Sequence, residues 1–282
     1  MPDPKRLLNT LEQAVEAFRN TPGRRGRLVR PQDAAEILVA GDLHGNVENF
    51  RRLLQKADLS RHPGRHLVLQ EVVHGPFRYP TGGDKSHQLV DLAAGLKCEF
   101  PTRVHVLLGN HELAQWSGQW IAKDEIDLNE LFARGVREAY SDHAEEILRA
   151  YRELFSTWPL AVKSENRILM CHSIPPASRL ENFDPALLED EAPDGDHWKP
   201  GEALHALLWG RDVRAETVRA FLERMDADLL ITGHIPCPEG YATPNEQQLI
   251  LDSLGAEAGY CLFPTGQPLT HSELVARVRR LQ

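Results

Sequence analysis

The chain has 282 residues, of which 41% are hydrophobic and 26% charged, so it is long enough to bury a large core. Its formal net charge is −9, whereas proteins that bind the phosphate backbone of nucleic acids usually carry a basic face. No apolar run reaches the roughly 18 to 20 residues of a membrane-spanning helix, and the four cysteines form no C-x-x-C pair. These features predict a cytoplasmic protein with no nucleic-acid partner and no membrane partner, and they leave its oligomeric state open.

Residues 1–36 are expected to form an N-terminal helical extension. Leu7, Leu11 and Phe18 recur at a helical spacing, which places them on one face of a packing helix. The main domain is then expected to span residues 37–282.

In the main domain, short aliphatic runs alternate with helical patterns, which is typical of layered α/β architectures. The predicted strands are 37–40, 66–70, 104–108, 168–171, 229–232, 248–252 and 260–263. Helical patterns occupy 47–56, 85–95 and 113–155, and the last of these is expected to be a helical cap insertion. Residues 75–83 and 174–200 are rich in Gly, Pro or acidic side chains and are expected to be loops.

Metal-capable side chains follow five of the predicted strands, where an α/β fold gathers its active site. They are Asp42, His44, Glu71, Asn110, His172 and His234. Two ions about 3.5 to 4 Å apart can bind the attacking and leaving oxygens of an in-line displacement. Such a pair needs a shared carboxylate, for which Glu71 is the available residue. Imidazole and carboxylate ligands without a thiolate favour Mn, Fe or Zn.

His111 directly follows a predicted ligand in sequence, so its side chain should point away from the metals and toward the leaving group. That position suits a general acid. A general acid needs an orienting partner, and the nearby candidates are His74, Asp84 and Glu112.

Three segments resemble signatures of the metallophosphoesterase (calcineurin-like) superfamily, and in particular its phosphoprotein phosphatase branch of serine/threonine phosphatases. They are Gly-Asp-Leu-His-Gly at 41–45, Leu-Leu-Gly-Asn-His-Glu at 107–112 and Leu-Leu-Trp-Gly-Arg-Asp at 207–212. The resemblance implies a four-layer αββα sandwich. It also implies that the six residues named above are metal ligands, that Asn110 also contacts the substrate phosphate and that His111 is the proton donor.

The second motif departs from the family pattern. Where the family has Gly-Asp-x-x-Asp-Arg-Gly, this chain reads Gln-Glu-Val-Val-His-Gly-Pro at 70–76. Glu71 replaces the bridging Asp, His74 stands where the orienting acid is expected, and Gly75 replaces a phosphate-binding Arg. Arg211 is the best candidate to replace that arginine, followed by Arg78 and Arg214.

These observations predict a dinuclear metal-dependent phosphatase that hydrolyses phosphate monoesters, with phosphoserine or phosphothreonine favoured by the resemblance. The predicted mechanism is direct attack by a metal-bridging hydroxide, with His111 as general acid. A nucleotide or dinucleoside polyphosphate hydrolase is the alternative within enzymes, because it uses the same metal core. A catalytically impaired metal-binding relative with a regulatory role is the second alternative, suggested by the altered segment at 70–76.

Overall fold

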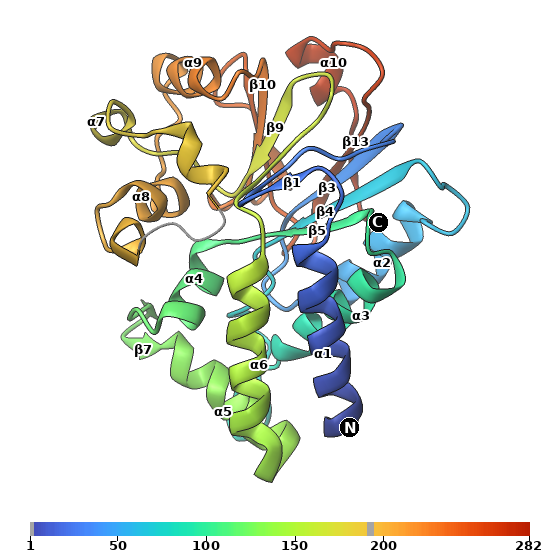
Figure 1. Cartoon of the computed structure of the whole chain (residues 1–282), viewed down its shortest axis with the longest axis vertical. Helices are drawn as coiled ribbons and strands as arrows, with labels where there is room; N and C mark the ends of the chain where they lie inside the picture. The colour runs from blue at the N-terminus through green and yellow to red at the C-terminus, as the bar shows by residue number, and fades with distance from the viewer. Residues whose placement is uncertain (1–2, 191–194) are drawn as a thin grey trace.

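Two facing β-sheets with helices on their outer sides form the core of the protein (Figure 1). The structure is a computed structural model, which describes residues 3–190 and 195–282. The five-stranded sheet has the order β14 (Val278–Arg280), β13 (Gly259–Pro264), β3 (Glu36–Asp42), β4 (Arg65–Gln70), β5 (Val104–Leu107). The seven-stranded sheet has the order β1 (Arg24–Arg25), β2 (Leu28–Val29), β8 (Ala161–Lys163), β9 (Ile168–Cys171), β10 (Leu229–Thr232), β12 (Gln248–Leu251), β11 (Tyr241–Ala242).

Successive side chains of β3 belong alternately to two different hydrophobic clusters. In β3, Ile37 and Val39 lie in a buried cluster with residues of the seven-stranded sheet such as Met170 and Ile231, so the two sheets pack face to face. Leu38 and Ala40 of the same strand belong to the cluster formed with the helices. A strand that is buried on both faces is apolar without interruption, which is why its sequence shows no polar alternation.

Helices cover the outer face of each sheet, and the predicted αββα sandwich is therefore confirmed. Beside the five-stranded sheet lie α1 (Pro4–Arg19), α2 (Val47–Ala57), α3 (His87–Glu99), α5 (Leu128–Tyr140) and α6 (Ala144–Thr157). α9 (Ala215–Arg224) packs against β10 of the seven-stranded sheet. The remaining helices are α4 (Asn110–Ser117), α7 (Ala177–Leu180), α8 (Ala203–Trp209), α10 (His271–Val275) and the 3-10 turns η1 (Ser141–His143), η2 (Pro185–Leu188) and η3 (Gly195–Trp198).

The N-terminal segment is tied to the rest of the fold. α1 begins after Asp3, whose side chain accepts a hydrogen bond from the Lys5 backbone N–H, and it packs against α3 and α6. After α1, β1 and β2 join the edge of the seven-stranded sheet. The sequence did not predict these strands, because two residues are too few to show a periodicity. The buried ammonium of Lys97 further links this segment to α3 through Thr21 Oγ1, 2.8 Å away.

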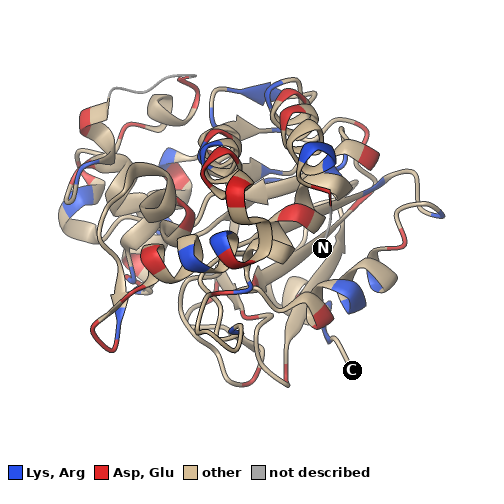
Figure 2. Cartoon of the chain, turned by 90° about the horizontal axis from the view of Figure 1, so that it is seen from below, with Lys and Arg blue, Asp and Glu red and all other residues tan. Residues whose placement is uncertain are grey.

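Residues 113–155 contain most of α4, the short hairpin of β6 (Ala122–Lys123) and β7 (Ile126–Asp127), and then α5, η1 and α6. The segment 174–200 contains three short helical turns, and its residues 191–194 lie outside the described part of the chain. Acidic and basic residues are interspersed along the helices seen from this side (Figure 2). Within the described residues, no helix combines the length and the apolar character needed to cross a bilayer.

Candidate metal centre

The six predicted metal ligands converge where the two sheets meet at the carboxyl ends of their parallel strands. Asp42 is the last residue of β3, Glu71 follows β4 directly, and His172 follows β9 directly. β3 runs parallel to β4, and β9 runs parallel to β10, so each pair of strands ends at the same edge of its sheet. A bridge between Asp42 and Asp252 joins the two edges. The strand ends alone therefore bring these side chains together.

Glu71 belongs to both groups of side chains that could hold a metal ion. One group is Glu71 with His44 and His111, and the other is Glu71 with His172 and His234; within each group the ligand atoms lie within 4.8 Å of one another. Glu71 Oε2 lies 3.2 Å from His172 Nε2 and 3.8 Å from His44 Nε2. A carboxylate with an imidazole on each side has the placement that a bridging ligand requires.

Asn110 and Asp42 complete the second group. His172 Nε2 lies 2.9 Å from Asn110 Oδ1 and 3.1 Å from His234 Nδ1. Asp42 Oδ2 accepts a hydrogen bond of 2.7 Å from the His234 backbone N–H, which fixes the loop that carries this histidine. Gly233 precedes it, and a Cβ at Gly233 would lie 2.1 Å from Asp42 Oδ1, so only glycine allows this approach.

The chemistry of these residues fits bound cations. Asp42 Oδ1 and His234 Nε2 are buried and have no hydrogen-bond partner, although buried polar atoms in proteins are nearly always paired. Burial, followed by mutual repulsion of the acidic groups, raises the pKa of Glu71 well above its usual value. Burial lowers the pKa of His234 to about 3, so its imidazole is neutral, as a metal ligand must be. Two cations placed here would offset the repulsion between the neighbouring carboxylates. They would also bind the unpaired Asp42 Oδ1 and His234 Nε2 atoms.

His111 is oriented by His74 and, through it, by Gln115. His111 Nδ1 lies 3.0 Å from His74 Nδ1, and His74 Nε2 lies 3.2 Å from Gln115 Oε1. Because the amide oxygen only accepts, His74 carries its proton on Nε2 and accepts at Nδ1 from His111 Nδ1–H. This leaves His111 Nε2 for chemistry with a substrate. The sequence singled out His74 but not Gln115, whose spacing of four residues from His111 on α4 was the available signal.

Replacing His74 by alanine is expected to lower kcat about 10- to 100-fold with little change in KM, because His111 loses the group that orients it. Gln115→Leu should act in the same direction with a smaller effect, since His74 keeps its place but loses a partner. Steady-state kinetics on a phosphoserine peptide, the substrate class predicted from the sequence, measure both values. An unchanged kcat in His74→Ala would show that His111 needs no orienting partner.

Glu112 does not orient His111 but holds together the two loops on either side of it in the fold. Its Oε1 accepts from the backbone N–H groups of Val72 (2.8 Å) and Val73 (3.0 Å), and its Oε2 accepts from Gly109 N–H at 3.1 Å. The side chain is fully buried, and burial raises its pKa to about 7. Glu112 thus joins the loop after β4, which carries Glu71, to the loop after β5.

Glu112→Gln is expected to lower the free energy of unfolding by about 1 to 3 kcal/mol, because its NH2 group would face a backbone N–H that then lacks an acceptor. Thermal or urea unfolding measures the change. The exposed Glu12→Gln provides a matched control that removes one negative charge without a buried partner, and equal stabilities of the two variants would contradict this role.

The predicted phosphate-binding arginines differ in their surroundings. Arg211 is exposed, and its Nη1 donates to the backbone oxygen of His234 at 3.1 Å, so it stands at the rim of the metal centre. Arg78 pairs with Asp84 at 3.1 Å. Asp84 also accepts from Ser86 N–H at 2.8 Å, so its contacts with Arg78 and Ser86 hold the loop between β4 and α3 and do not orient His111. Arg214 contacts Asp212 at 2.5 Å, outside the metal cluster.

Packing excludes a side chain at residue 75, where the family that the sequence resembles has an arginine. A Cβ at Gly75 would lie 1.9 Å from the backbone oxygen of His44. The loop after β4 therefore touches the loop after β3 too closely to carry a side chain at this point, and any replacement for the arginine must come from elsewhere in the chain.

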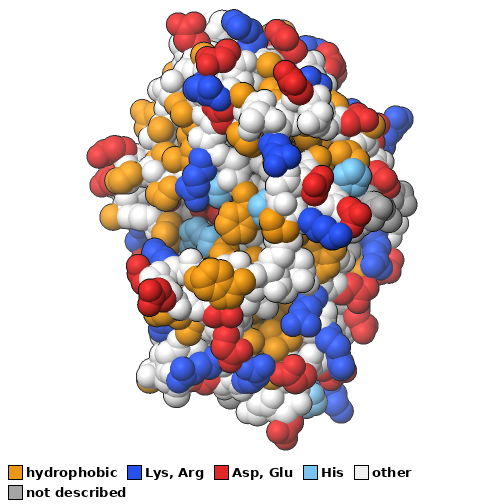
Figure 3. Space-filling model, turned by 90° about the vertical axis from the view of Figure 1, so that its left-hand side faces the viewer, with side chains coloured by type: hydrophobic (Ala, Val, Ile, Leu, Met, Phe, Trp, Pro, Cys, Tyr) orange, Lys and Arg blue, Asp and Glu red, His pale blue; other side chains and the backbone are white. Residues whose placement is uncertain are grey.

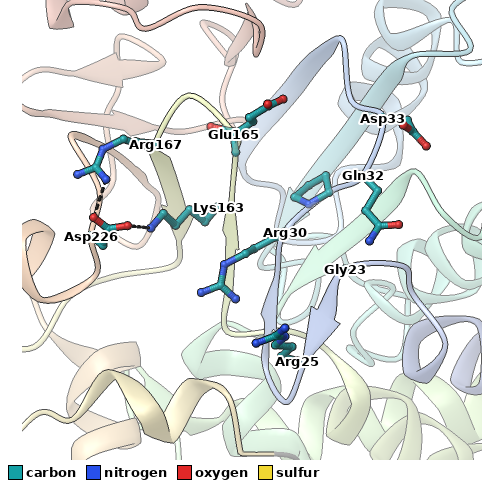
Figure 4. A pocket seen from close by; sticks show the side chains of 11 residues that line it. Gly23, Arg25, Arg30, Gln32, Asp33, Lys163, Glu165, Arg167 and Asp226 are labelled. Atoms are coloured by element: carbon teal, nitrogen blue, oxygen red, sulfur yellow. Dashed lines mark hydrogen bonds and ion pairs between the residues drawn. The ribbon is translucent and has the colours of Figure 1, made fainter.

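Histidine side chains reach the surface near the centre of the face shown in Figure 3, beside hydrophobic and basic side chains. The cavity of about 780 Å³ drawn in Figure 4 lies elsewhere. It is lined by Lys163 and Arg167, which flank the turn before β9, whereas His172 follows the other end of that strand. Both cations face Asp226 there, with ion pairs of 3.0 and 2.5 Å.

Known proteins that are similar to this chain indicate its family and its fold. The family model for calcineurin-like phosphoesterases matches residues 35–238. The chain is 25% identical over 250 residues to a probable serine/threonine-protein phosphatase of Encephalitozoon cuniculi, which covers 83% of this chain and 50% of that protein. It is 28% identical over 137 residues to the human serine/threonine-protein phosphatase with EF-hands 2, which covers 49% of this chain and 16% of that protein. The chain thus spans half of one relative and a smaller part of the other.

Two solved structures share the fold. A protein serine/threonine phosphatase of Saccharomyces cerevisiae superposes with a TM-score of 0.66 at 18% identity, covering 97% of this chain and 86% of that one. A cold-active protein-tyrosine phosphatase of a Shewanella species superposes with a TM-score of 0.60 at 13% identity, covering 95% and 84%. The family model covers well over half of the chain, including all five strand-end loops that carry the six candidate ligands, and this protein therefore belongs to the calcineurin-like phosphoesterase family.

Proposed function

We propose that the protein is a dinuclear metal-dependent phosphatase that hydrolyses phosphate monoesters without a phosphoenzyme. The observation that carries the proposal is the place of Glu71, which is shared by two groups of metal-capable side chains next to His111. One of the two groups also includes His111, but His111 Nδ1 is occupied by His74. The remaining nitrogen, His111 Nε2, can act either as a proton donor or as a metal ligand, and we assign it the role of proton donor.

The proposed ligands of the two ions are Asp42, His44, Glu71, Asn110, His172 and His234. When bound, two such ions supply an acidified water and stabilise negative charge on the phosphate oxygens. His111 Nε2 gives a proton to the departing oxygen, so that an alcohol rather than an alkoxide leaves. Arg211 and the Asn110 amide hold the phosphate in place, and the contact of Arg211 with the His234 backbone aims its guanidinium.

Phosphoserine or phosphothreonine is the proposed substrate group, supported by the names of the two relatives. The second candidate, a dinucleoside polyphosphate hydrolase, would use the same centre. Hydrolysis assays with the metal-free protein supplied with Mn, Fe or Zn test the proposal. The expected result is metal-dependent release of phosphate from p-nitrophenyl phosphate and from a phosphoserine peptide, at a higher kcat/KM than release of phosphate from a phosphotyrosine peptide or cleavage of a dinucleoside tetraphosphate into nucleotides.

A catalytically impaired relative would give another result: the protein would bind metal and hydrolyse none of these esters. The paired His111 and His74 favour the enzyme, because a metal-binding role alone requires no oriented proton donor. Inert protein with two bound ions would overturn the proposal.

A further inference from the structure

A cavity of about 670 Å³ lies beside the loop that carries His44. Its walls come from three parts of the chain: the loop before α2 with the first turns of that helix, the loop between β4 and α3 with the start of α3, and residues 254–256 after β12. Lining residues that matter for its chemistry are Gly45, Asn46, Arg51, Phe77, Arg78 and Lys85. Gly45 follows His44 directly, so the cavity adjoins the metal centre.

The cavity carries an excess of basic side chains, although the chain as a whole has a net charge of −9. Four cations line it, Arg51, Arg52, Arg78 and Lys85, against one carboxylate, Glu48. Arg52 is neutralised by Glu48 at 2.5 Å, and Arg78 pairs with Asp84.

Two cations of the cavity remain for a ligand. Among the described residues, none of the recorded ion pairs involves Arg51 or Lys85. Lys85 Nζ lies 5.1 Å above the Tyr79 ring, which positions the ammonium without neutralising it. By contrast, Lys163 and Arg167 in the cavity of Figure 4 are already paired with Asp226.

We propose that this basic cavity is a specificity subsite that binds acidic side chains flanking the phosphorylated residue of a peptide substrate. The proposal rests on the proposed phosphatase function. Arg51 and Lys85 come from α2 and from the loop after β4, so they lie on two walls of an open cavity and can meet carboxylates spaced along an extended peptide.

The lining suits a peptide better than a nucleotide. Phe77, 41% exposed, is the one aromatic side chain among the lining residues, and it offers an apolar contact. The amide of Asn46 is committed to the Leu254 backbone oxygen at 2.8 Å, and that of Asn49 to Ser253 at 2.9 Å. Neither amide is therefore available to read the edge of a base.

The test uses two phosphoserine peptides that differ only in having acidic or neutral flanking residues, with p-nitrophenyl phosphate as a substrate that lacks flanks. The variant is the double replacement Arg51→Gln and Lys85→Gln. Lys56→Gln is the control for a single lost charge, because it removes one exposed cation from the other end of α2. Metal-loaded wild type should prefer the acidic peptide through a lower KM.

The preference should fall about fivefold in the double variant, as expected for two charge contacts that remain open to solvent, while kcat and p-nitrophenyl phosphate hydrolysis stay unchanged. Lys56→Gln should keep the full preference, and added salt should weaken it. Equal preference in wild type and double variant overturns the subsite, as does equal loss in Lys56→Gln. A dinucleoside polyphosphate that is preferred over both peptides and loses most in the double variant overturns the peptide assignment.

Failure of the phosphatase function itself has a different signature, namely no hydrolysis of p-nitrophenyl phosphate by metal-loaded wild type. In that case, fluorescence anisotropy of the same two peptides still measures their binding to the cavity. Tighter binding of the acidic peptide that the double variant loses supports the subsite, and equal binding overturns it.

Discussion

Replacing Glu71 by alanine is expected to abolish phosphatase activity and to leave the protein unable to hold two metal ions. Glu71 is the one residue shared by both candidate groups, and its Oε2 lies 3.2 Å and 3.8 Å from the imidazoles of His172 and His44. Metal content per chain measures the loss directly. Metal at about 100 times its dissociation constant should stabilise wild type by about 2.7 kcal/mol per site, and Glu71→Ala should lose most of this gain.

Glu71→Asp is the control for this prediction, because it keeps the charge but shortens the side chain by one methylene. It should bind metal more weakly than wild type and more strongly than Glu71→Ala. The metal-free alanine variant should unfold near the metal-free wild type, since the buried Glu71 carboxyl has a raised pKa and gains little from its neighbours without cations. Full metal content in Glu71→Ala would contradict a bridging role.

His111→Gln is expected to lower kcat on a phosphoserine peptide about 10²- to 10⁴-fold, which is the usual contribution of a general acid. Serine is a poor leaving group and needs the proton that His111 Nε2 supplies. p-Nitrophenolate leaves without a proton, so the fall on p-nitrophenyl phosphate should be clearly smaller. Comparing the two substrates measures the proton-donor role separately from binding.

Metal content is the control for the His111 variant, because His111 also belongs to one candidate metal group. A proton donor can be removed without loss of metal, whereas a ligand cannot. His111→Gln with two bound ions and a substrate-dependent fall supports the assignment. A variant that loses an ion and falls equally on both substrates would make His111 a ligand.

The fold was predictable because the strands of both sheets are buried on two faces. Such strands leave continuous apolar runs in the sequence, as at residues 37–40 and 229–232. Because parallel strands end at the same edge of a sheet, the loop residues that follow these runs can be predicted to lie close together. β1 and β2 were not predictable, because a strand of two residues shows no periodicity. Their place at the sheet edge depends on the pairing of β2 with β8.

The candidate site was predictable only as far as strand ends determine it. Those ends place the six candidate ligands, but the contact between His74 and Gln115 joins residues 41 positions apart, and only the four-residue spacing of Gln115 from His111 on α4 indicated it. The role of Glu112 depends on three backbone N–H groups from two loops, which side-chain chemistry alone does not indicate.

The altered second motif has a structural reason. Gly75 lies against the His44 backbone, which excludes a side chain at that position, and Arg78 lies in the following loop, paired with Asp84. The same loop carries Phe77 and Lys85 into the basic cavity. In sequence these residues are an irregular stretch rich in Gly and Pro, and their common cavity becomes visible only when α2 is placed opposite them.

A crystal structure of the metal-loaded protein, with anomalous scattering recorded at the metal edge, tests the central claim most directly. We expect two ions about 3.5 to 4 Å apart, each bonded to an oxygen of Glu71, with His172 and His234 on one ion and His44 on the other. Asp42 Oδ1 and His234 Nε2, which are buried without a partner, should each bond an ion. A single ion, or two ions that do not share Glu71, would contradict the account.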